Sequence, residues 1–501
     1  MKNKRKSTMM LVVVIMVVSL LAGCGGSNNS KNNTAGNKES NVQPKSDISI
    51  MMPFFSKEPP ANNEAIEKIE QFTNSKVNVT WVPANGYPEK LNATIASGTL
   101  PKVMVVMDMK APIIVNSAQS GMFWELGSYL KDYEHLAKLN EIALKNSAVE
   151  GKIFSIPRER VVGRNGLIIR KDWLNNLGLE EPKTVDDLYE VIKQFATNDP
   201  DKNGTADTYG LTENKDLNVF NYVLAALGGA NEWLIEDGKF KSAYETDTYM
   251  EALQFVKKLI DEKLLNRDFA IYPNRDDDIN NGRAGISFNP LDTTISGTYA
   301  EMKQLNTDGE FTVLGGLDQG EGKKVLGGTG FNGTFMIPKS SVKTEEELKE
   351  VLTFMNDLME EPMIELFTWG IEGKHFTKEN DTITVTNRDG YVAEVDPLTQ
   401  LVYLNYNYLY TAQSQSEIGK TIEKIWAENE ANAVHNPAQP FTSPMQVEKG
   451  TELTQLISDA RVKFLLGEMD EAGWSATIEQ WKSNGGTKIA EELTASYAAL
   501  Q

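Results

Sequence analysis

Oxygen-bearing side chains alternate along one short loop, and their spacing is suited to binding a metal ion. Positions 1, 3, 5, 7 and 9 of the loop are Asp199, Asp201, Asn203, Thr205 and Asp207, with Gly204 at position 6. Ca²⁺ prefers such a cage of oxygen atoms, in which Thr205 would offer its carbonyl and glycine allows the tight turn. Position 12, where a full calcium loop has a bidentate acid, is Gly210. We expect a structural calcium ion here; the alternative is a polar loop without a metal.

Other motifs with catalytic or cofactor associations lack the context that they need. Gly328–Gly333 matches G-x-G-x-x-G, but a strand is expected after it, whereas a dinucleotide fingerprint opens a helix. The three histidines are scattered and form no zinc-enzyme pair. Ser340–Lys343 fits S-x-x-K without its partner motifs, and we attribute Asp276–Asp278 to a solvated turn. We therefore predict no catalytic residues.

Aromatic and polar residues in predicted loops are a better indication of a ligand. Sugar rings have apolar faces rimmed by hydroxyl groups, so a sugar site combines aromatic side chains with Arg, Asn and Asp. The candidates are Phe54, Phe55, Arg158, Arg160, Trp233, Asn289, Phe331, Asn332 and Trp369. The guanidinium groups of Arg158 and Arg160 suit a uronate carboxylate. For each aromatic residue the alternative is packing in the core, and for the two arginines it is neutralisation of their acidic surroundings.

The only cysteine, Cys24, follows a basic N-terminus and an apolar run from Met9 to Leu21. That run is too short to span a bilayer comfortably, and Leu21-Ala-Gly-Cys24 resembles a bacterial lipobox. We expect a lipoprotein signal peptide over residues 1–23, cleavage before Cys24 and acylation of its thiol by palmitate. Residues 24–46, rich in Gly, Ser, Asn and Lys, predict a flexible tether. The alternative is a secreted protein with an unpaired thiol.

Charge narrows the class of partner. The 501-residue chain has 50 basic and 70 acidic residues; without residues 1–23 it has 46 basic and 70 acidic residues, a net charge of −24 over 478 residues. This excess repels phosphate backbones and anionic headgroups, so we expect no nucleic acid partner. Attachment to the membrane would then depend on the acyl chain. The length allows two sizeable cores.

Along the chain, segments with the apolar spacing of a strand alternate with segments that have the apolar spacing of a helix. The first part of the body predicts strands at 48–53, 77–82 and 103–107, and helices at 63–73 and 90–96. After Gly151 we expect strands at 153–156 and 167–170, a helix at 171–178, and a helix that begins at Thr184 with Asp187 in a capping box. Helices are also expected at 249–262 and 345–360 and over most of the region from Ser414. This alternation predicts an α/β fold.

Four segments together resemble the extracellular solute-binding proteins of family 1, which supply ABC importers. They are GKIFSIP at 151–157, LIIRKDWL at 167–174, PKTVDDL at 182–188 and GIEGKHF at 370–376. Within the family, the segment GIEGKHF and the chain length resemble the LplA- or LipO-type lipoproteins of Gram-positive bacteria, which are similar to alginate-oligosaccharide-binding proteins. The resemblance extends over most of residues 47–501. One departure is Pro101-Lys102, where members often have Pro-Asp, so Lys102 receives no ligand role.

The resemblance implies an α/β fold of the type II periplasmic-binding-protein class, with two discontinuous lobes and a mostly helical C-terminal region. We place the N-terminal lobe at 47–161 and 330–368, and the C-terminal lobe at 162–329 and 369–501. The chain would then cross between lobes near Val161, Gly330 and Trp369. Alginate-binding relatives carry a similar metal loop, which favours calcium at 199–207.

The same resemblance implies a monomeric, lipid-anchored substrate-binding subunit at the extracellular face of the cell membrane. It would capture an oligosaccharide, with an acidic one favoured, between its lobes and deliver it to ABC permease subunits. Three alternatives stay open. A surface polysaccharide-degrading enzyme would need an acid/base pair beside the sugar. A peptide-transport lipoprotein would bind peptides, and an adhesin or chaperone would bind no small ligand.

Overall fold

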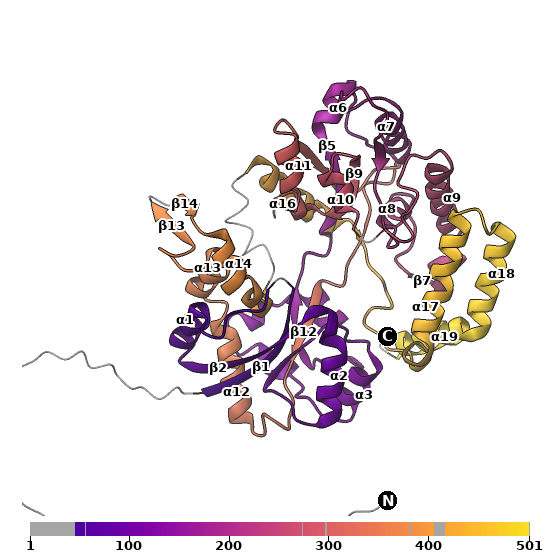
Figure 1. The fold of residues 1–501 in the computed structure, drawn as a ribbon. Helices are drawn as coiled ribbons and strands as arrows, with labels where there is room; N and C mark the ends of the chain where they lie inside the picture. The colour runs from indigo at the N-terminus through magenta and orange to yellow at the C-terminus, as the bar shows by residue number, and fades with distance from the viewer. Residues whose placement is uncertain are drawn as a thin grey trace, which may run out of the picture. The chain divides into compact units, whose positions relative to one another are not determined.

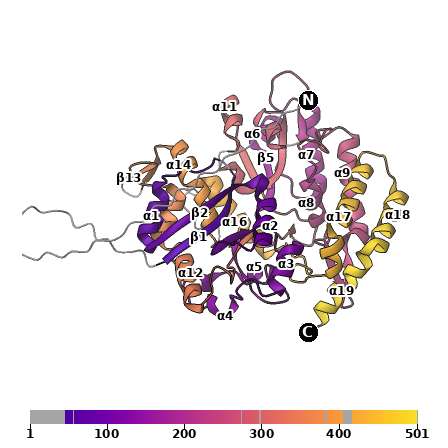
Figure 2. The ribbon, with the colours of Figure 1, turned by 60° about the horizontal axis from the view of Figure 1, so that its bottom comes forward.

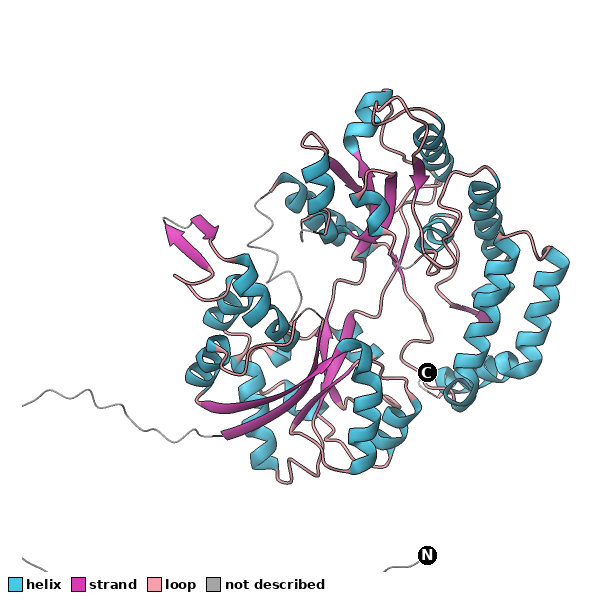
Figure 3. Cartoon of the chain, in the orientation of Figure 1, coloured by secondary structure: helices cyan, strands magenta, loops and turns pink. Residues whose placement is uncertain are grey.

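Two multi-stranded β-sheets, each beside its own hydrophobic core, organise the chain in the computed structural model (Figures 1 and 3). The residues that the structure describes are 46–55, 57–272, 274–295, 298–379, 382–404 and 416–499. The predicted signal peptide, Cys24 and nearly all of the predicted tether lie outside these ranges. Within them, no helix combines the length and the apolar character needed to cross a bilayer.

The first sheet has the strand order β2-β1-β3-β12-β4. Strand β1 is parallel to β2 and β3, whereas β12 is antiparallel to both of its neighbours. All four residues of β3 are buried, which agrees with the continuous apolar run in the sequence. Because β12 lies between β3 and β4, the sheet joins distant parts of the chain. The strands are β1 Ser46–Phe54, β2 Ser75–Pro83, β3 Val103–Val106, β4 Ser155–Glu159 and β12 Phe331–Met336.

Helices on the first sheet begin and end where the sequence supplies caps. The Asn63 side chain accepts hydrogen bonds from the first turn of α1, and α2 ends at Gly98, whose φ of 71° favours glycine. The α-helices of this lobe are α1 Glu64–Thr73, α2 Tyr87–Ser97, α3 Pro112–Gln119, α4 Gly127–Leu130, α5 Glu141–Asn146, α12 Glu345–Asp357, α13 Glu361–Trp369 and α14 Arg388–Glu394. Shorter elements are η1 Ala84–Gly86, η2 Leu136–Lys138, η5 Asp396–Leu401 and the hairpin β13 Phe376–Glu379 with β14 Thr382–Val385.

The second sheet has the order β10-β5-β9-β6. Strand β5 is antiparallel to β10 and β9, and β6 is parallel to β9. The predicted capping box of Thr184 and Asp187 is present at the start of α7. The sheet consists of β5 Asn165–Arg170, β6 Tyr209–Leu211, β9 Ala284–Pro290 and β10 Phe311–Leu314; the helices are α6 Lys171–Leu177, α7 Val185–Thr197, α8 Asn218–Ala226, α9 Asp247–Asp261, α10 Asp276–Asn280 and α11 Ala300–Leu305. Short elements are β7 Trp233–Glu236, β8 Lys239–Ser242, η3 Ala243–Glu245, η4 Leu291–Thr294 and β11 Val325–Leu326.

The C-terminal region is mostly helical, as the sequence predicts. Figures 1 and 2 show α17 beside α9 and α18, and α17 contacts α9, α18 and α19. The strand β15 pairs with β11, so the region also joins the second lobe through its backbone. Its elements are α16 Glu417–Ala431, β15 Ala433–Val434, α17 Pro444–Leu465, α18 Glu471–Trp481, η6 Lys482–Gly486 and α19 Thr487–Ala498.

The chain passes between the two sheets along two neighbouring segments. One joins β4 to β5 and the other joins β11 to β12, and they are hydrogen-bonded from the Arg160 N–H to the Gly330 carbonyl and from the Gly328 N–H to the Val162 carbonyl, both at 2.9 Å. A third crossing is not near Trp369, where the sequence analysis places it. Residues up to Leu404 still pack in the first core, because η5 buries its apolar residues against β1, and the C-terminal lobe resumes with α16.

The prediction of a solvated turn at Asp276–Asp278 is also wrong. These residues open α10, and the Asp278 side chain is buried. It forms an ion pair with Arg283 at 2.6 Å and accepts a hydrogen bond from the Thr212 hydroxyl at 3.0 Å. Arg283 and Thr212 offset the cost of burying this carboxylate. Both lie outside its helix, so the sequence around Asp278 does not indicate them.

Candidate functional site

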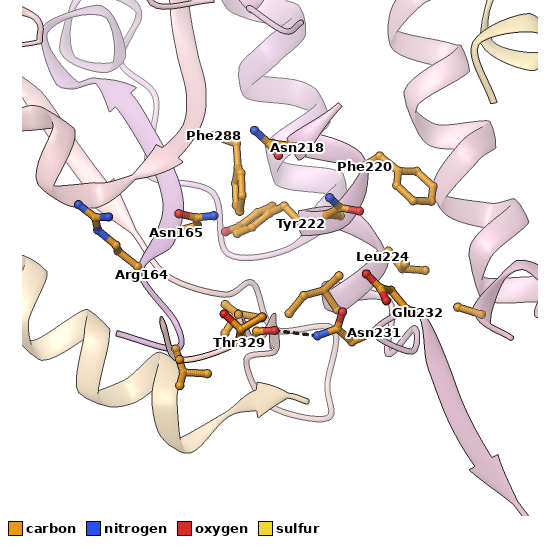
Figure 4. A pocket seen from close by; sticks show the side chains of 18 of the residues that line it. Arg164, Asn165, Asn218, Phe220, Tyr222, Leu224, Asn231, Glu232, Phe288 and Thr329 are labelled. Atoms are coloured by element: carbon orange, nitrogen blue, oxygen red, sulfur yellow. Dashed lines mark hydrogen bonds between the residues drawn. The ribbon is translucent and has the colours of Figure 1, made fainter. Parts of the chain in front are cut away.

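A cavity of about 470 Å³ lies where the two crossing segments meet α8 and the end of β9 (Figure 4). Its walls come from the crossing segments, from α8, from the loop before β7, and from α17. The residues from the crossings are Arg160, Val161, Val162, Arg164, Asn165, Val325, Leu326, Gly327, Gly328, Thr329, Gly330 and Phe331. The remaining residues are Asn218, Phe220, Asn221, Tyr222, Leu224, Asn231, Glu232, Ala243, Tyr244, Tyr249, Phe288, Ile457 and Arg461.

Aromatic rings form the middle of the cavity wall. The ring centroids of Tyr222 and Phe288 are 5.1 Å apart, and those of Phe220 and Tyr249 are 4.7 Å apart. The Tyr222 hydroxyl donates to the Gly315 carbonyl at 2.5 Å, and burial raises the pKa of this phenol above its ordinary value. The rings are therefore held rigidly by the core and line the cavity with only a small part of their surface exposed.

Four asparagines supply neutral polar groups. Asn165, Asn218, Asn221 and Asn231 line the cavity, and each amide can both donate and accept a hydrogen bond. The Asn231 amide donates to the Gly327 carbonyl at 2.8 Å and to the Val434 carbonyl at 2.9 Å, which ties the loop before β7 to the crossing segment. Amides that both donate and accept suit hydroxyl groups, which do the same.

Three guanidinium groups and one carboxylate make the charged part of the wall: Arg160, Arg164, Arg461 and Glu232. Arg164 binds Asp292 through two hydrogen bonds, from Nε at 2.9 Å and from Nη2 at 2.5 Å. The guanidinium of Arg461 lies 5.5 Å from the ring centroid of Phe220. Asp292 balances the charge of Arg164, and Arg160, Arg461 and Glu232 are the other charged groups of the wall, so the cavity suits a polar ligand.

A smaller cavity of about 180 Å³ continues the larger one toward the first sheet, and the two share Thr329 and Phe331. It lies beyond the carboxyl end of β3 and is also lined by Met107, Asp108, Met109, Lys110, Asn146, Asn332, Gly333 and Gln439. The Lys110 ammonium donates to the carbonyl of Phe441, a residue packed against the second core, at 3.1 Å. Burial lowers the pKa of Lys110 to about 8. Together the cavities present groups from both lobes.

Three of the predicted ligand-binding residues line these cavities. Arg160 is in the wall of the larger one, Phe331 is in both, and Asn332 is in the smaller one. The glycines of the G-x-G-x-x-G segment lie at the crossing, where Gly330 and Gly333 have φ values of 84° and 76°. A side chain at Gly333 would meet the Val106 carbonyl at 3.1 Å, so glycine here allows close backbone approach.

Three other predicted residues are buried and are not among the residues that line either cavity. Arg158 is fully buried, where it donates to Gln400. Trp233 packs against Trp481 and Phe240 in the second core, with ring centroids 6.1 and 6.2 Å away. Asn289 donates to Asp276 at 2.7 Å and to the Tyr299 hydroxyl at 2.9 Å. The binding role of these three residues stays a prediction, and the contacts named above are contacts within the protein.

The remaining predicted aromatic residues lie in the first lobe and are not part of either cavity wall. Phe54 ends β1, and Phe55 follows it with 60% of its surface exposed. Strands β1 and β3 are parallel, so these rings lie at the same sheet edge as residues 107–110. Trp369 ends α13, with its ring centroid 6.5 Å from that of Phe376.

The predicted metal loop folds around its own side chains. The Asp199 carboxylate accepts hydrogen bonds from the backbone N–H groups of Asn203 and Gly204, at 3.0 and 2.9 Å. The Asn203 amide donates to Asp201 at 2.8 Å and to Asp207 at 3.3 Å, so these side chains face one another. Gly204 has the positive φ expected at position 6, 81°. Nevertheless, nowhere in the described part of the chain do three or more His, Cys, Asp or Glu side chains form a ready metal site.

Sequence reasoning missed most of the cavity wall. The loop before β7 offered a signal, because Asn231 and Glu232 directly precede the chosen Trp233 in a glycine-containing loop. Arg164 was likewise four residues beyond the chosen Arg160. No comparable signal pointed to Tyr222 or Arg461, because each lies on a helix whose orientation depends on tertiary packing.

Comparisons with known proteins identify the family. Residues 57–357 match the model of the bacterial extracellular solute-binding proteins. Two relatives from Bacillus subtilis are similar over 90% of this chain: the polygalacturonan/rhamnogalacturonan-binding protein YtcQ, at 35% identity with 91% of its length covered, and the lipoprotein LipO, at 36% identity with 92% covered.

Solved structures share the fold. The substrate-binding protein FusA of Streptococcus pneumoniae in complex with kestose gives a TM-score of 0.67 at 20% identity, covering 91% of this chain and 99% of that one. An EF-hand mutant of FusA with fructo-nystose gives 0.66 at 19% identity with the same coverage. The fold is therefore that of the type II solute-binding proteins, and the chain belongs to the bacterial extracellular solute-binding protein family.

Proposed function

We propose that this protein is the substrate-binding subunit of an ABC importer and that its ligand is an acidic oligosaccharide. The observation that carries the proposal is the composition of the cavity wall, in which three arginines accompany asparagines and aromatic rings. Rings pack against sugar faces, amides exchange hydrogen bonds with hydroxyls, and guanidinium groups pair with carboxylates. The Bacillus subtilis relative YtcQ is named a polygalacturonan/rhamnogalacturonan-binding protein, which supports the same ligand class.

The placement of the cavities supports a binding role in which the ligand favours closure of the two lobes around it. The larger cavity is built by the second lobe and the crossing segments, and the smaller one reaches Lys110 at the edge of the first sheet. A ligand that contacts both lobes favours the state in which both contacts are made at once. Such a ligand-bound state is what a permease can distinguish from the free protein.

Calorimetric titration with acidic and neutral oligosaccharides of equal length tests the proposal. We expect the acidic ligand to bind more tightly, and the Arg160→Ala variant to bind it about 10- to 100-fold more weakly, because a hydrogen bond to a charged group contributes about 1.5–3 kcal/mol. The control is Arg267→Ala, which removes an exposed arginine elsewhere on the second lobe. Binding of peptides with no response to any oligosaccharide would contradict the proposal.

We also propose that acylated Cys24 attaches the protein to the extracellular face of the cell membrane, where the permease subunits are reached. Its position after a basic and then an apolar segment supports this. Mass spectrometry of the mature protein tests it: we expect an N-terminal acylated cysteine, and the Cys24→Ala variant should be found in the culture medium or retain its signal peptide. A mature protein with an unmodified thiol would refute the anchor.

Calcium is proposed as a structural ion of the loop at 199–207. Three carboxylates and the Asn203 amide of the loop are hard oxygen donors, which Ca²⁺ prefers, and the turn at Gly204 lets the loop bend around an ion. The FusA protein, of which an EF-hand mutant has been solved, supports the same proposal. We expect Ca²⁺ to raise the melting temperature of the wild type and of the control Asp132→Ala, but not of Asp199→Ala. Equal shifts in all three proteins would exclude this loop.

A further inference from the structure

Lys110 is the cation in the wall of the smaller cavity, and a short turn between β3 and α3 holds it there. Strand β3 is fully buried and ends at Val106, and α3 begins at Pro112. Between them, the backbone N–H of Lys110 donates to the Asp108 carboxylate at 2.8 Å, which closes an Asx turn. The position of Lys110 at the edge of the first sheet is therefore set by its own loop.

The Lys110 ammonium is largely withdrawn from water, and its hydrogen-bond partner is uncharged. It donates to the Phe441 carbonyl of the second lobe at 3.1 Å. Among the residues that the structure describes, no carboxylate forms an ion pair with it. Because a buried cation loses its hydration, burial lowers the pKa of Lys110 to about 8. An ammonium has three donors, so two are left for a ligand.

Asp108, although close in sequence, does not neutralise this ammonium. The Asp108 residue is exposed, so water screens its charge, and its carboxylate accepts the backbone hydrogen bond of the turn. Its charge raises the pKa of Lys110, but the opposite effect of burial is larger. The other polar residues of this cavity wall are uncharged: Asn146, Thr329, Asn332 and Gln439. The charged residues in and after α5, which line a separate cavity with Phe441, are Glu141, Lys145 and Glu150.

Lys110 also differs from the arginines of the larger cavity in the lobe to which it belongs. Arg164 lies just before β5 and is paired with Asp292, and Arg461 lies on α17. Lys110 is thus the cation that the first lobe contributes to the two cavities. Since its ammonium already contacts the Phe441 carbonyl, a ligand group bound to it would lie where the two lobes meet.

We infer that Lys110 is a ligand-binding residue whose ammonium pairs with a carboxylate of the oligosaccharide in the smaller cavity. The inference rests on the proposed function and assigns a residue to the acidic group of the ligand. The carboxylate supplies the counter-charge that the buried ammonium lacks, so the complex favours protonated lysine. Where Lys110 of the free protein is partly deprotonated, binding of an acidic ligand should therefore take up a proton, whereas binding of a neutral ligand should not.

Calorimetric titration with tetragalacturonate in two buffers of different ionisation enthalpy measures this proton uptake. A group with a pKa of about 8 is about one-quarter protonated at pH 8.5 and about nine-tenths protonated at pH 7. We expect uptake of about 0.7 proton per ligand at pH 8.5 and about 0.1 at pH 7, and a Kd about fourfold weaker at the higher pH. The fully methyl-esterified tetrasaccharide, which has the same rings without the charges, should bind without proton uptake.

Variants of Lys110 separate its charge from its titration. Lys110→Met keeps the apolar stem, and we expect it to bind tetragalacturonate about 10- to 100-fold more weakly, without proton uptake, and with a smaller loss for the ester. Lys110→Arg keeps a cation that does not titrate in this range, so tetragalacturonate should bind it without proton uptake. The control Lys145→Met removes an exposed lysine of α5 and should behave as the wild type does.

The outcomes separate this inference from the function on which it rests. Tetragalacturonate binding to the wild type without proton uptake at pH 8.5, or with the same uptake as the ester, overturns the inference and leaves the proposed function in place. A folded Lys110→Met protein that keeps the wild-type uptake overturns it too, as does a wild type that binds neutral oligosaccharides but not tetragalacturonate. A wild type that binds no oligosaccharide removes the proposed function, and this inference with it.

Discussion

Replacing Arg164 by methionine is expected to destabilise the second lobe, because this arginine neutralises a buried carboxylate. Its guanidinium makes two hydrogen bonds to Asp292, at 2.9 and 2.5 Å. The Asp292 side chain is 3% exposed, against 26% for Arg164. Methionine keeps the apolar stem of arginine but leaves Asp292 buried without this partner.

The size of the effect follows from that burial. Removing one partner of a buried ion pair costs about 3–5 kcal/mol, since the remaining charge stays uncompensated. We therefore expect Arg164→Met to lower the free energy of unfolding by about this amount. Adding Asp292→Asn removes the stranded charge, so the double variant should recover more than half of the loss. The matched control is Lys171→Met, whose pair with Glu310 is exposed, and which should cost less than about 1 kcal/mol.

Urea unfolding followed by tryptophan fluorescence and by circular dichroism measures these differences. The signals must change together for a single free energy to be assigned, because a two-lobe protein can unfold in steps. If Arg164→Met costs no more than Lys171→Met, or if Asp292→Asn restores nothing, the account of Arg164 and Asp292 as a buried pair is wrong.

Further predictions concern titration, close packing and the core. Burial raises the pKa of Glu213 to about 7, so the protonated carboxyl favours the folded state. Its contribution to the free energy of unfolding is complete below about pH 4.5 and is lost as the pH rises through 7. Glu213→Gln should therefore flatten the pH dependence of unfolding over that range. A Cβ at Gly163 would lie 2.4 Å from that of Asn429, so Gly163→Ala should cost about 1–3 kcal/mol in thermal unfolding, whereas Gly86→Ala, with open space around it, should be nearly neutral. Trp233→Phe should lower the melting temperature yet leave the oligosaccharide Kd within twofold, since this ring lies in the core. A large loss of affinity would show instead that Trp233 takes part in ligand binding.

Local features were predictable from the sequence because their causes are local. The capping box of Thr184 and Asp187 and the end of α2 at Gly98 depend on a few neighbouring residues. The buried strand β3 follows from an unbroken apolar run. The end of the first lobe was not predictable in this way: apolar residues around Leu398 and Leu401 indicate that a face is buried, but not in which of two cores.

In the candidate site too, residues fixed by local structure could be predicted from the sequence, whereas residues positioned by tertiary packing could not. Arg158 and Arg160 are two residues apart and look equivalent in the sequence, yet β4 ends at Glu159. Arg158 therefore stays under the first sheet, while Arg160 begins the crossing segment and reaches the cavity. The residues of α8 and α17 that line the cavity could not be found, because their faces are set by packing with distant segments, as where the Arg461 guanidinium lies over the Phe220 ring.

The way in which distant segments complete each sheet bears on how an extracellular protein is delivered. The first sheet needs β12, from residues 331–336, between β3 and β4, and its core extends to Leu404. The second core needs residues as late as Leu493. Neither lobe can close early, since such long-range contacts form only after the intervening chain is available. A chain emerging from synthesis would thus have neither core complete until it is nearly full length, and an incompletely folded chain is the form that a narrow export channel can admit.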